Sequence, residues 1–247
     1  MRPRALGLAA LSVFLLASTS AFAADRPARV VTPFEQKGPF ESITIGPPLP
    51  QGACALGILG DPAFSVEYLL PPDDDYLTLI DPTSCLACPS GSLALTAAHV
   101  ALDFPTACAQ PVTVSIVGAI DQNGCMTPDV SNVLCGPIAY NLSPGEAGAF
   151  IFNLPLPAGC CISQKVFLSV NFIAPGVGCN TSDTRPRLLT TDNCQPCTSW
   201  NDWAGGTDDL CTDVGFPGNP IMYVDGECCA TTPAIQSSWG LLKSQYR

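Results

Sequence analysis

The chain of 247 residues is poor in the side chains that most enzymes use for proton transfer and metal binding. It has one histidine, His99, and only 13% charged residues. Histidine-based catalysis therefore has a single candidate, and a metal site with two histidine ligands is excluded. The sequence also lacks a phosphate-binding P-loop, a dinucleotide-binding glycine motif, a His-Glu-x-x-His helix and a Gly-x-Ser-x-Gly nucleophile elbow.

Basic residues and long apolar runs are scarce as well. The chain carries 10 Lys and Arg against 21 Asp and Glu, a formal net charge of −11. Nucleic acids and anionic lipid surfaces attract basic faces, so we expect neither as a partner. After Ala24 no apolar stretch approaches the ~20 residues that a spanning helix needs, so we expect no membrane span.

The N-terminal residues have the pattern of an export signal. Arg2 and Arg4 precede an apolar run over residues 5–17, and Ala21-Phe22-Ala23 offers small residues to a signal peptidase. We predict a signal peptide over residues 1–23 and a secreted product, either extracellular or periplasmic. Residues 24–52 are rich in proline and predict an extended leader with one edge strand near residues 41–45.

The remaining sequence predicts one all-β domain over residues 53–247. The chain contains 21 Gly and 25 Pro, and its apolar residues alternate with polar ones in short runs. This pattern favours an antiparallel β-sandwich of jelly-roll or immunoglobulin-like type. We expect 149–154 and 165–172 to form a strand pair. The predicted strands are residues 64–70, 76–80, 92–104, 111–117, 149–154, 165–172, 188–191, 220–224 and 235–241.

All fourteen cysteines follow the predicted cleavage site. An even number in an exported chain predicts up to seven disulfides, which makes the domain disulfide-rich. The two Cys-x-x-Cys pairs could form a zinc site, but an oxidising compartment favours disulfides. Adjacent cysteines point to opposite sides of a strand and should bond to different partners. The cysteines are Cys54, Cys85, Cys88, Cys108, Cys125, Cys135, Cys160, Cys161, Cys179, Cys194, Cys197, Cys211, Cys228 and Cys229.

His99 lies in Leu95-Thr-Ala-Ala-His99, which resembles the catalytic-histidine segment of trypsin-like serine proteases. Ser238-Trp-Gly240 resembles the substrate-lining strand of that family. Upstream of Ser238, that family has the nucleophile motif Gly-Asp-Ser-Gly-Gly. This sequence has Gly215-Phe-Pro-Gly-Asn-Pro220 there instead, so acyl transfer has no nucleophile. The resemblance therefore implies an inactive relative at most. The simpler interpretation makes His99 a strand residue packed beside small alanines.

The segment from Thr198 to Asp209 is the strongest candidate for a binding site. It contains Trp200 and Trp203 with Asn201 and Asp202 in a Gly-rich loop, a combination typical of sugar-binding surfaces. The alternative places one or both tryptophans at the end of the core. Asp208 and Asp209 are candidates for a structural calcium site, although EF-hand spacing is absent.

We therefore predict a secreted, non-enzymatic binding or structural protein of a surface or matrix, with a polysaccharide or another surface protein as partner. We predict no catalytic residue and no cofactor other than the calcium just described. The alternative is a secreted glycosidase-like hydrolase that uses an Asp/Glu pair. The scattered Glu67, Glu146 and Glu227 do not identify such a pair.

Overall fold

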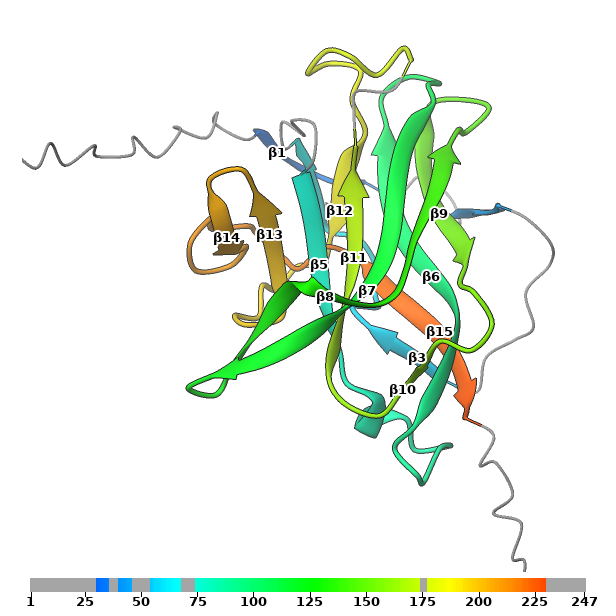
Figure 1. Ribbon diagram of the computed structural model, residues 1–247. Helices are drawn as coiled ribbons and strands as arrows, with labels where there is room; N and C mark the ends of the chain where they lie inside the picture. Colours follow the sequence, from blue (N-terminus) through cyan, green and yellow to red (C-terminus); the bar gives the residue numbers. More distant parts are fainter. Residues whose placement is uncertain (1–29, 36–39, 46–53, 68–73, 174–176, 230–247) are drawn as a thin grey trace, which may run out of the picture.

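The computed structural model describes residues 30–35, 40–45, 54–67, 74–173 and 177–229, and these form two packed β-sheets (Figure 1). The fold is the predicted disulfide-rich β-sandwich. In the part of the chain that is described, no helix is long and apolar enough to cross a membrane. A 3₁₀ turn, η1 (Pro82–Ser84), precedes β6.

The first sheet, called sheet A, has nine strands, and β6 is at its centre. One side of β6 pairs with β15 and β12, and the other with β10 and β9. The pairings are antiparallel except that between β2 and β9. Sheet A contains β1 (Val30–Pro33), β2 (Glu41–Thr44), β3 (Cys54–Gly57), β4 (Phe64–Glu67), β6 (Leu93–Phe104), β9 (Gly148–Pro155), β10 (Cys161–Ile162), β12 (Arg187–Thr190) and β15 (Met222–Cys228).

The second sheet, called sheet B, is a six-stranded antiparallel sheet. Its strands, in spatial order, are β14 (Gly206–Asp209), β13 (Ser199–Trp203), β5 (Asp74–Ile80), β11 (Val166–Phe172), β7 (Gln110–Gln122) and β8 (Cys125–Leu142).

Most predicted strands match observed ones, but the expected pairing of 149–154 with 165–172 is wrong. Strand β9 pairs with β6 in sheet A, whereas β11 pairs with β5 and β7 in sheet B. The chain crosses from one sheet to the other between them, so both strands find partners distant in sequence. The predicted strand over 235–241 lies outside the described residues.

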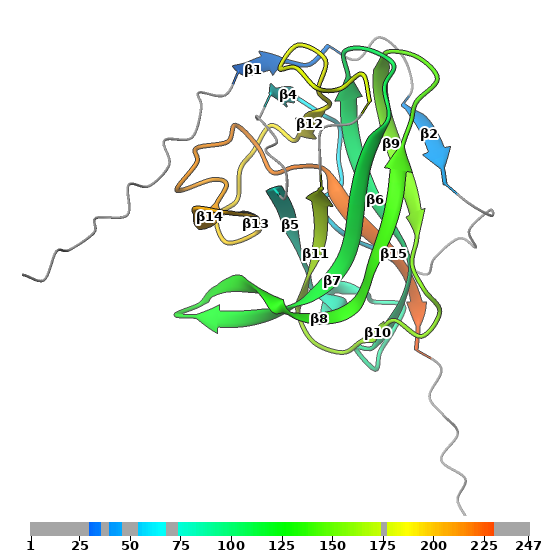
Figure 2. The same ribbon diagram turned by 45° about the horizontal axis from the view of Figure 1, so that its top comes forward.

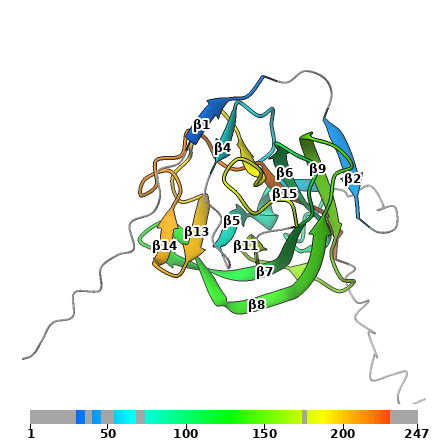
Figure 3. The ribbon, with the colours of Figure 1, turned by 90° about the horizontal axis from the view of Figure 1, so that it is seen from above.

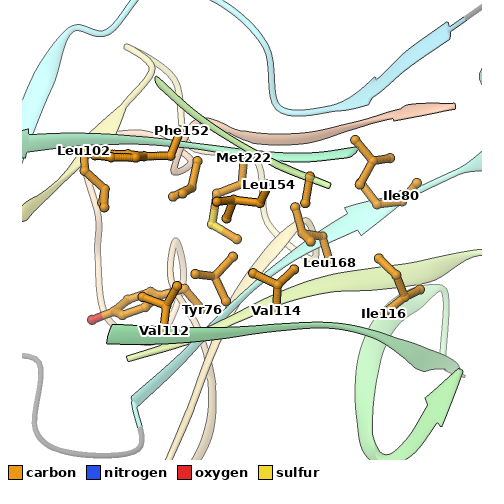
Figure 4. Packing of buried hydrophobic residues seen from close by; sticks show 14 of the residues in the cluster. Tyr76, Ile80, Leu102, Val112, Val114, Ile116, Phe152, Leu154, Leu168 and Met222 are labelled. Atoms are coloured by element: carbon orange, nitrogen blue, oxygen red, sulfur yellow. The ribbon is translucent and has the colours of Figure 1, made fainter. Parts of the chain in front are cut away.

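The core lies between the two sheets. Leu102, Phe152 and Met222 of sheet A face Val114 and Leu168 of sheet B, and all five side chains are fully buried (Figure 4). These residues occupy alternate strand positions, as the apolar periodicity predicts. Burial of this alternating face is the principal driving force for packing one sheet on the other.

Strand β6 carries a bulge that decides which side chains enter this core. Its pairing with β15 shifts so that Gly226 is opposite Leu95 and Asp225 is opposite Ala97, leaving Thr96 unpaired. An extra residue reverses the inward and outward faces of the rest of the strand. His99 consequently lies on the outer face of sheet A, while Ala98 and Val100 point into the core.

Strands β1 and β2 lie at opposite edges of sheet A, and the described residues next to them contact its outer face. Strand β1 pairs with β4 at one edge and β2 with β9 at the other (Figure 3). Phe34 and Phe40 stack with ring centroids 6.0 Å apart and pack against a small apolar cluster on this face. The predicted division into signal peptide, leader and domain stays a prediction.

Seven disulfides pair all fourteen cysteines, and neither Cys-x-x-Cys pair is bonded internally. Cys160 and Cys161 bond to different partners, as do Cys228 and Cys229, which confirms the expectation from strand geometry. The pairs are Cys54–Cys85, Cys88–Cys228, Cys108–Cys179, Cys125–Cys197, Cys135–Cys160, Cys161–Cys229 and Cys194–Cys211.

Candidate functional site

The predicted binding segment forms a hairpin at the edge of sheet B. The sequence suggested a Gly-rich loop, but the structure shows β13 and β14 joined by a tight turn (Figure 2). Disulfides flank the hairpin on both sides. Cys197, just before β13, is bonded to Cys125 of β8, and Cys211, just after β14, is bonded to Cys194. The hairpin is thus covalently held against the sandwich.

Two of the four predicted ligand residues are inaccessible. Trp200 is 8% exposed and packs on the outer face of sheet B with Leu77, Val117 and Phe167. The neighbouring Asn201 is fully buried, and its Nδ2 donates a hydrogen bond to the main-chain oxygen of Asp75 at 3.0 Å. Both side chains anchor the hairpin to β5, on opposite faces of the sheet, and Trp200 lies in an apolar cluster on the outer face and not at the end of the core.

The other two predicted residues, Asp202 and Trp203, are partly exposed. The indole Nε1 of Trp203 donates to Asp208 Oδ2 at 2.8 Å across the hairpin, and Thr207 Oγ1 donates to Asp202 Oδ1. A Cβ added to Gly205 would lie 2.3 Å or less from two carbons of the Trp203 ring, so the indole lies directly over this glycine. The turn therefore fixes the orientation of the one accessible indole of the hairpin.

The carboxylates proposed for calcium have separate structural partners. Asp209 is 3% exposed, and its Oδ1 accepts hydrogen bonds from the backbone N–H groups of Cys211 and Thr212. Its Oδ2 accepts the N–H of Cys197 at 2.5 Å. Asp208 precedes it in the strand and receives the indole N–H of Trp203. Because successive strand side chains point to opposite faces, the two carboxylates do not converge, and calcium binding stays a prediction.

A further carboxyl group, that of Asp75, lies beside the hairpin on the neighbouring strand β5. Asp75 of β5 is opposite Asp202 of β13 on the outer face of sheet B, and it is 9% exposed. Ser169 Oγ lies 2.8 Å from both of its carboxylate oxygens. Burial, together with the negative charges of Asp202 and Asp74, raises the pKa of Asp75 to about 7 despite the hydrogen bond from Ser169.

The sequence contained a weak signal for this site. Asp75 ends a run of three aspartates before a strand, and Ser169 lies on the polar face of another predicted strand. Nothing in the sequence shows that β5 lies between β11 and β13, so the convergence of Asp75, Ser169 and Asp202 requires the sheet order.

The lone histidine forms a closed polar cluster on the outer face of sheet A. His99 Nδ1 lies 2.6 Å from Asn153 Oδ1, and Nε2 lies 3.0 Å from Asp225 Oδ2. The ring stacks on Tyr223 with centroids 4.3 Å apart. Asn153 Nδ2 in turn donates to Ser42 Oγ at 2.7 Å.

Both ring nitrogens of His99 therefore face side-chain oxygens of Asn153 and Asp225, and neither of these is the hydroxyl group that a serine-protease mechanism needs. His99 is 6% exposed and lies beside Ala97 and Ala101, which confirms the interpretation as a packed strand residue. Ser238 of the protease-like segment lies outside the described residues. The hydrogen bonds of this cluster connect β6, β9, β15 and β2, and neither ring nitrogen of His99 is bonded to a hydroxyl group within the described residues.

The glutamates considered for hydrolysis occupy separate elements. Glu67 in β4 lies 3.7 Å from Arg187 in an ion pair, while Glu146 lies in the β8–β9 connection and Glu227 in β15. Among the described residues, the buried carboxyl group of Asp75 and the partly exposed one of Asp202 lie on adjacent strands, which is a more suitable arrangement for acid–base chemistry than that of these glutamates.

The fold and the hairpin define a disulfide-rich β-sandwich protein with a covalently held edge hairpin. The chain belongs to the family described as "Domain of unknown function (DUF7451)", whose profile matches residues 65–226. This span begins in β4, ends in β15 and contains the hairpin, Asp75 and His99. No curated protein matches the chain.

Two solved structures match parts of this chain at low identity. One contains the cysteine protease and lectin-like domains of Cwp84, a surface layer associated protein of Clostridium difficile, with 12% identity and a TM-score of 0.47. The match covers 71% of this chain and 36% of that one. The other is a variant of the clostridial cysteine protease Cwp84 after propeptide cleavage, with 12% identity and a TM-score of 0.42, covering 65% and 37%. The chain thus spans about a third of either protein.

Proposed function

We propose that this protein is a secreted, non-enzymatic binding protein of a cell surface or matrix, and that it contacts a polysaccharide through the β13–β14 hairpin. Another surface protein is the second type of partner consistent with this role. The seven disulfides support an oxidising location outside the cytoplasm. The acidic net charge argues against nucleic acid as the ligand.

The observation that carries this proposal is the fixed, partly exposed indole of Trp203. Its N–H is held by Asp208, whose carboxylate supplies a hydrogen-bonding group at the edge of the ring, and the ring lies over Gly205. A flat apolar ring with polar groups at its edge matches the alternation of C–H and hydroxyl groups on a sugar. Because the hairpin is preorganised by two disulfides, little conformational entropy is lost when a ligand binds.

Affinity electrophoresis through a panel of polysaccharides tests this proposal. We expect retardation of the wild-type protein by at least one polysaccharide, and loss of about tenfold or more in affinity in Trp203→Ala, equivalent to ~1.4 kcal/mol. Leu86→Ala is the matched control, because Leu86 is 93% exposed and lies outside the hairpin. Equal retardation of wild type and Trp203→Ala would remove the hairpin from the binding surface.

The second candidate function is a glycosidase-like hydrolase, favoured by the relation between Asp75 and Asp202. Retaining glycosidases use two carboxyl groups, one of which has a raised pKa and serves as the acid. Asp75 has a pKa of about 7, and Asp202 is its cross-strand neighbour.

Reducing-end assays on a glycan panel separate the two functions. Hydrolysis that is lost in both Asp75→Asn and Asp202→Asn, and kept in the exposed control Asp61→Asn, would establish the enzyme. Absence of hydrolysis on every glycan that the protein binds would support the non-enzymatic proposal.

A further inference from the structure

The β13–β14 hairpin carries negative charge and no positive charge. Residues 198–213 contain no lysine, arginine or histidine, and their acidic residues are Asp202, Asp208, Asp209 and Asp213. Asp209 and Asp213 accept hydrogen bonds from backbone N–H groups, and Asp202 lies on the face of β13 opposite to Trp203. Asp208 is therefore the carboxylate that meets the partly exposed Trp203 ring, through the bond of 2.8 Å from the indole Nε1.

The sheet that carries the hairpin is acidic as well. Within the described residues, all charged side chains in the six strands of sheet B are aspartates. Lys165, which directly precedes β11, is 3.4 Å from Asp81 in an ion pair just beyond the end of β5. The hairpin pairs with the other end of β5, where Asp75 is opposite Asp202.

The length of β5 keeps this lysine away from the hairpin. A strand rises by about 3.4 Å per residue, so roughly 20 Å separates Asp75 from Asp81. Charges in solvent are screened over about 8 Å at physiological ionic strength. Lys165 therefore does not neutralise the charge of Asp208 beside the Trp203 ring.

An indole ring with a carboxylate at its edge is an arrangement that binds cations. The face of the ring attracts an ammonium group within about 6 Å of its centroid. A carboxylate forms a charge-assisted hydrogen bond with the same group. The bond between Trp203 and Asp208 and the position of the ring over Gly205 fix both groups before a ligand binds. The hairpin thus favours a positively charged ligand over a neutral or negative one.

We propose that the polysaccharide bound by the hairpin carries free amino groups, with an ammonium group of the sugar in contact with the Trp203 ring and the Asp208 carboxylate. This inference rests on the proposed function, which assigns a sugar ligand to the hairpin. N-acetylated and neutral sugars lack the positive charge, and sugars with carboxylate or sulfate groups carry the opposite one. The acidic surface attracts the first class and repels the last.

Isothermal titration calorimetry with two oligosaccharides of the same length and linkage tests the inference. One is a glucosamine oligomer and the other an N-acetylglucosamine oligomer, so they differ only in the charge and acetylation of the amine. At about pH 5, where the amine is protonated, we expect the wild-type protein to bind the glucosamine oligomer about tenfold more tightly. Added sodium chloride should reduce this difference.

The possible results separate this inference from the proposed function. Equal affinities, tighter binding of the acetylated oligomer, or binding of other glycans alone would overturn the inference and leave the hairpin as a sugar site. Absence of binding to every polysaccharide of the panel would overturn the proposed function together with the inference.

The variant Asp208→Asn removes the charge and keeps an oxygen able to accept the indole N–H. We expect it to bind the glucosamine oligomer about tenfold more weakly. Asp61→Asn is the matched control, because it removes the same charge at an exposed position outside the hairpin and should bind like wild type. Equal losses in both variants, or equally tight binding of a lysine oligomer of the same charge, would overturn the inference, since net charge alone would then attract the ligand. If Asp208→Asn alters the near-ultraviolet circular dichroism, the comparison of the two oligosaccharides on the wild-type protein decides.

Discussion

The Ser169 hydroxyl lies 2.8 Å from both carboxylate oxygens of Asp75, and this carboxyl group has almost no access to water. One hydroxyl does not replace the hydration that burial removes, and Asp202 and Asp74 add negative charge nearby. The pKa of Asp75 is therefore raised to about 7. A carboxyl group that favours protonation in the folded state links the stability of sheet B to pH.

This linkage predicts that Asp75 makes the protein less stable as the pH rises from about 4 to about 7. The unfolded carboxyl group has a pKa of about 3.9, so in this window the folded state holds a proton that the unfolded state has lost. Asp75→Asn mimics the protonated group and should remove a change of a few kcal/mol in the free energy of unfolding. Guanidinium unfolding of both proteins between pH 4 and 8 measures it, with Asp61→Asn as control. Parallel pH profiles for wild type and Asp75→Asn would contradict the assignment.

A second prediction concerns the hydrogen bonds by which His99, through Asn153, fixes β2 to sheet A; these bonds are called the clamp. His99 holds Asn153, and Asn153 donates to Ser42 Oγ and Thr44 Oγ1. His99→Ala leaves Asn153 Oδ1 and Asp225 Oδ2 without their hydrogen-bond partner. The free energy of unfolding should therefore fall by about 1–3 kcal/mol. It should also speed amide exchange at Ile43. We expect a smaller loss in Thr44→Val, which leaves the imidazole contacts in place. A change below ~0.3 kcal/mol in His99→Ala would show that the clamp has no energetic role.

The turn of the hairpin offers a test that leaves Trp203 itself unchanged. Gly205→Ala places a Cβ where the indole lies, so the ring must move, whereas a Cβ at Gly145 meets no atom within 4 Å. We expect Gly205→Ala to alter the near-ultraviolet circular dichroism and to weaken polysaccharide binding severalfold. Gly145→Ala should match wild type in both measurements. Unchanged binding in Gly205→Ala would mean that the fixed orientation of Trp203 is irrelevant to the ligand.

The two disulfides that flank the hairpin should differ in their contribution to stability. Cys125–Cys197 closes a sequence separation of 72 residues, and Cys194–Cys211 one of 17. Restriction of the unfolded chain predicts that the first stabilises the fold by about 1 kcal/mol more than the second. Guanidinium unfolding of the Cys125→Ser/Cys197→Ser and Cys194→Ser/Cys211→Ser double variants tests this order. A larger loss from the shorter loop would show that native packing, and not chain entropy, dominates.

The sequence predicted strands well where one face of the strand is buried. Strands β6, β7 and β11 were found because their apolar residues alternate against the core. The long β8 was missed because most of its residues are at least partly exposed, and it contains Pro128 and Pro137, which are tolerated at a sheet edge. Strands β13 and β14 were interpreted as a loop because Gly205 and Gly206 dominate the local pattern.

The candidate site could be predicted only in part, because it depends on sheet order and on the bulge in β6. The importance of the segment around Trp203 followed from its composition, but the burial of Trp200 depends on the packing of β13 beside β5. His99 was placed on a strand beside alanines, whereas its outward direction follows from the unpaired Thr96. Neither the burial of Trp200 nor the outward direction of His99 is encoded in a local sequence pattern, since each requires a partner strand distant in sequence.

We propose that the protein binds a polysaccharide at the β13–β14 hairpin without cleaving it. Titration of ¹⁵N-labelled protein with an oligosaccharide from the best-retained polysaccharide, followed by nuclear magnetic resonance, tests it most directly. We predict shifts that concentrate on the Trp203 indole and the amides of Asp202 to Thr207, with the oligosaccharide recovered intact. Shifts confined to another surface, or an oligosaccharide shortened during the titration, would contradict the account.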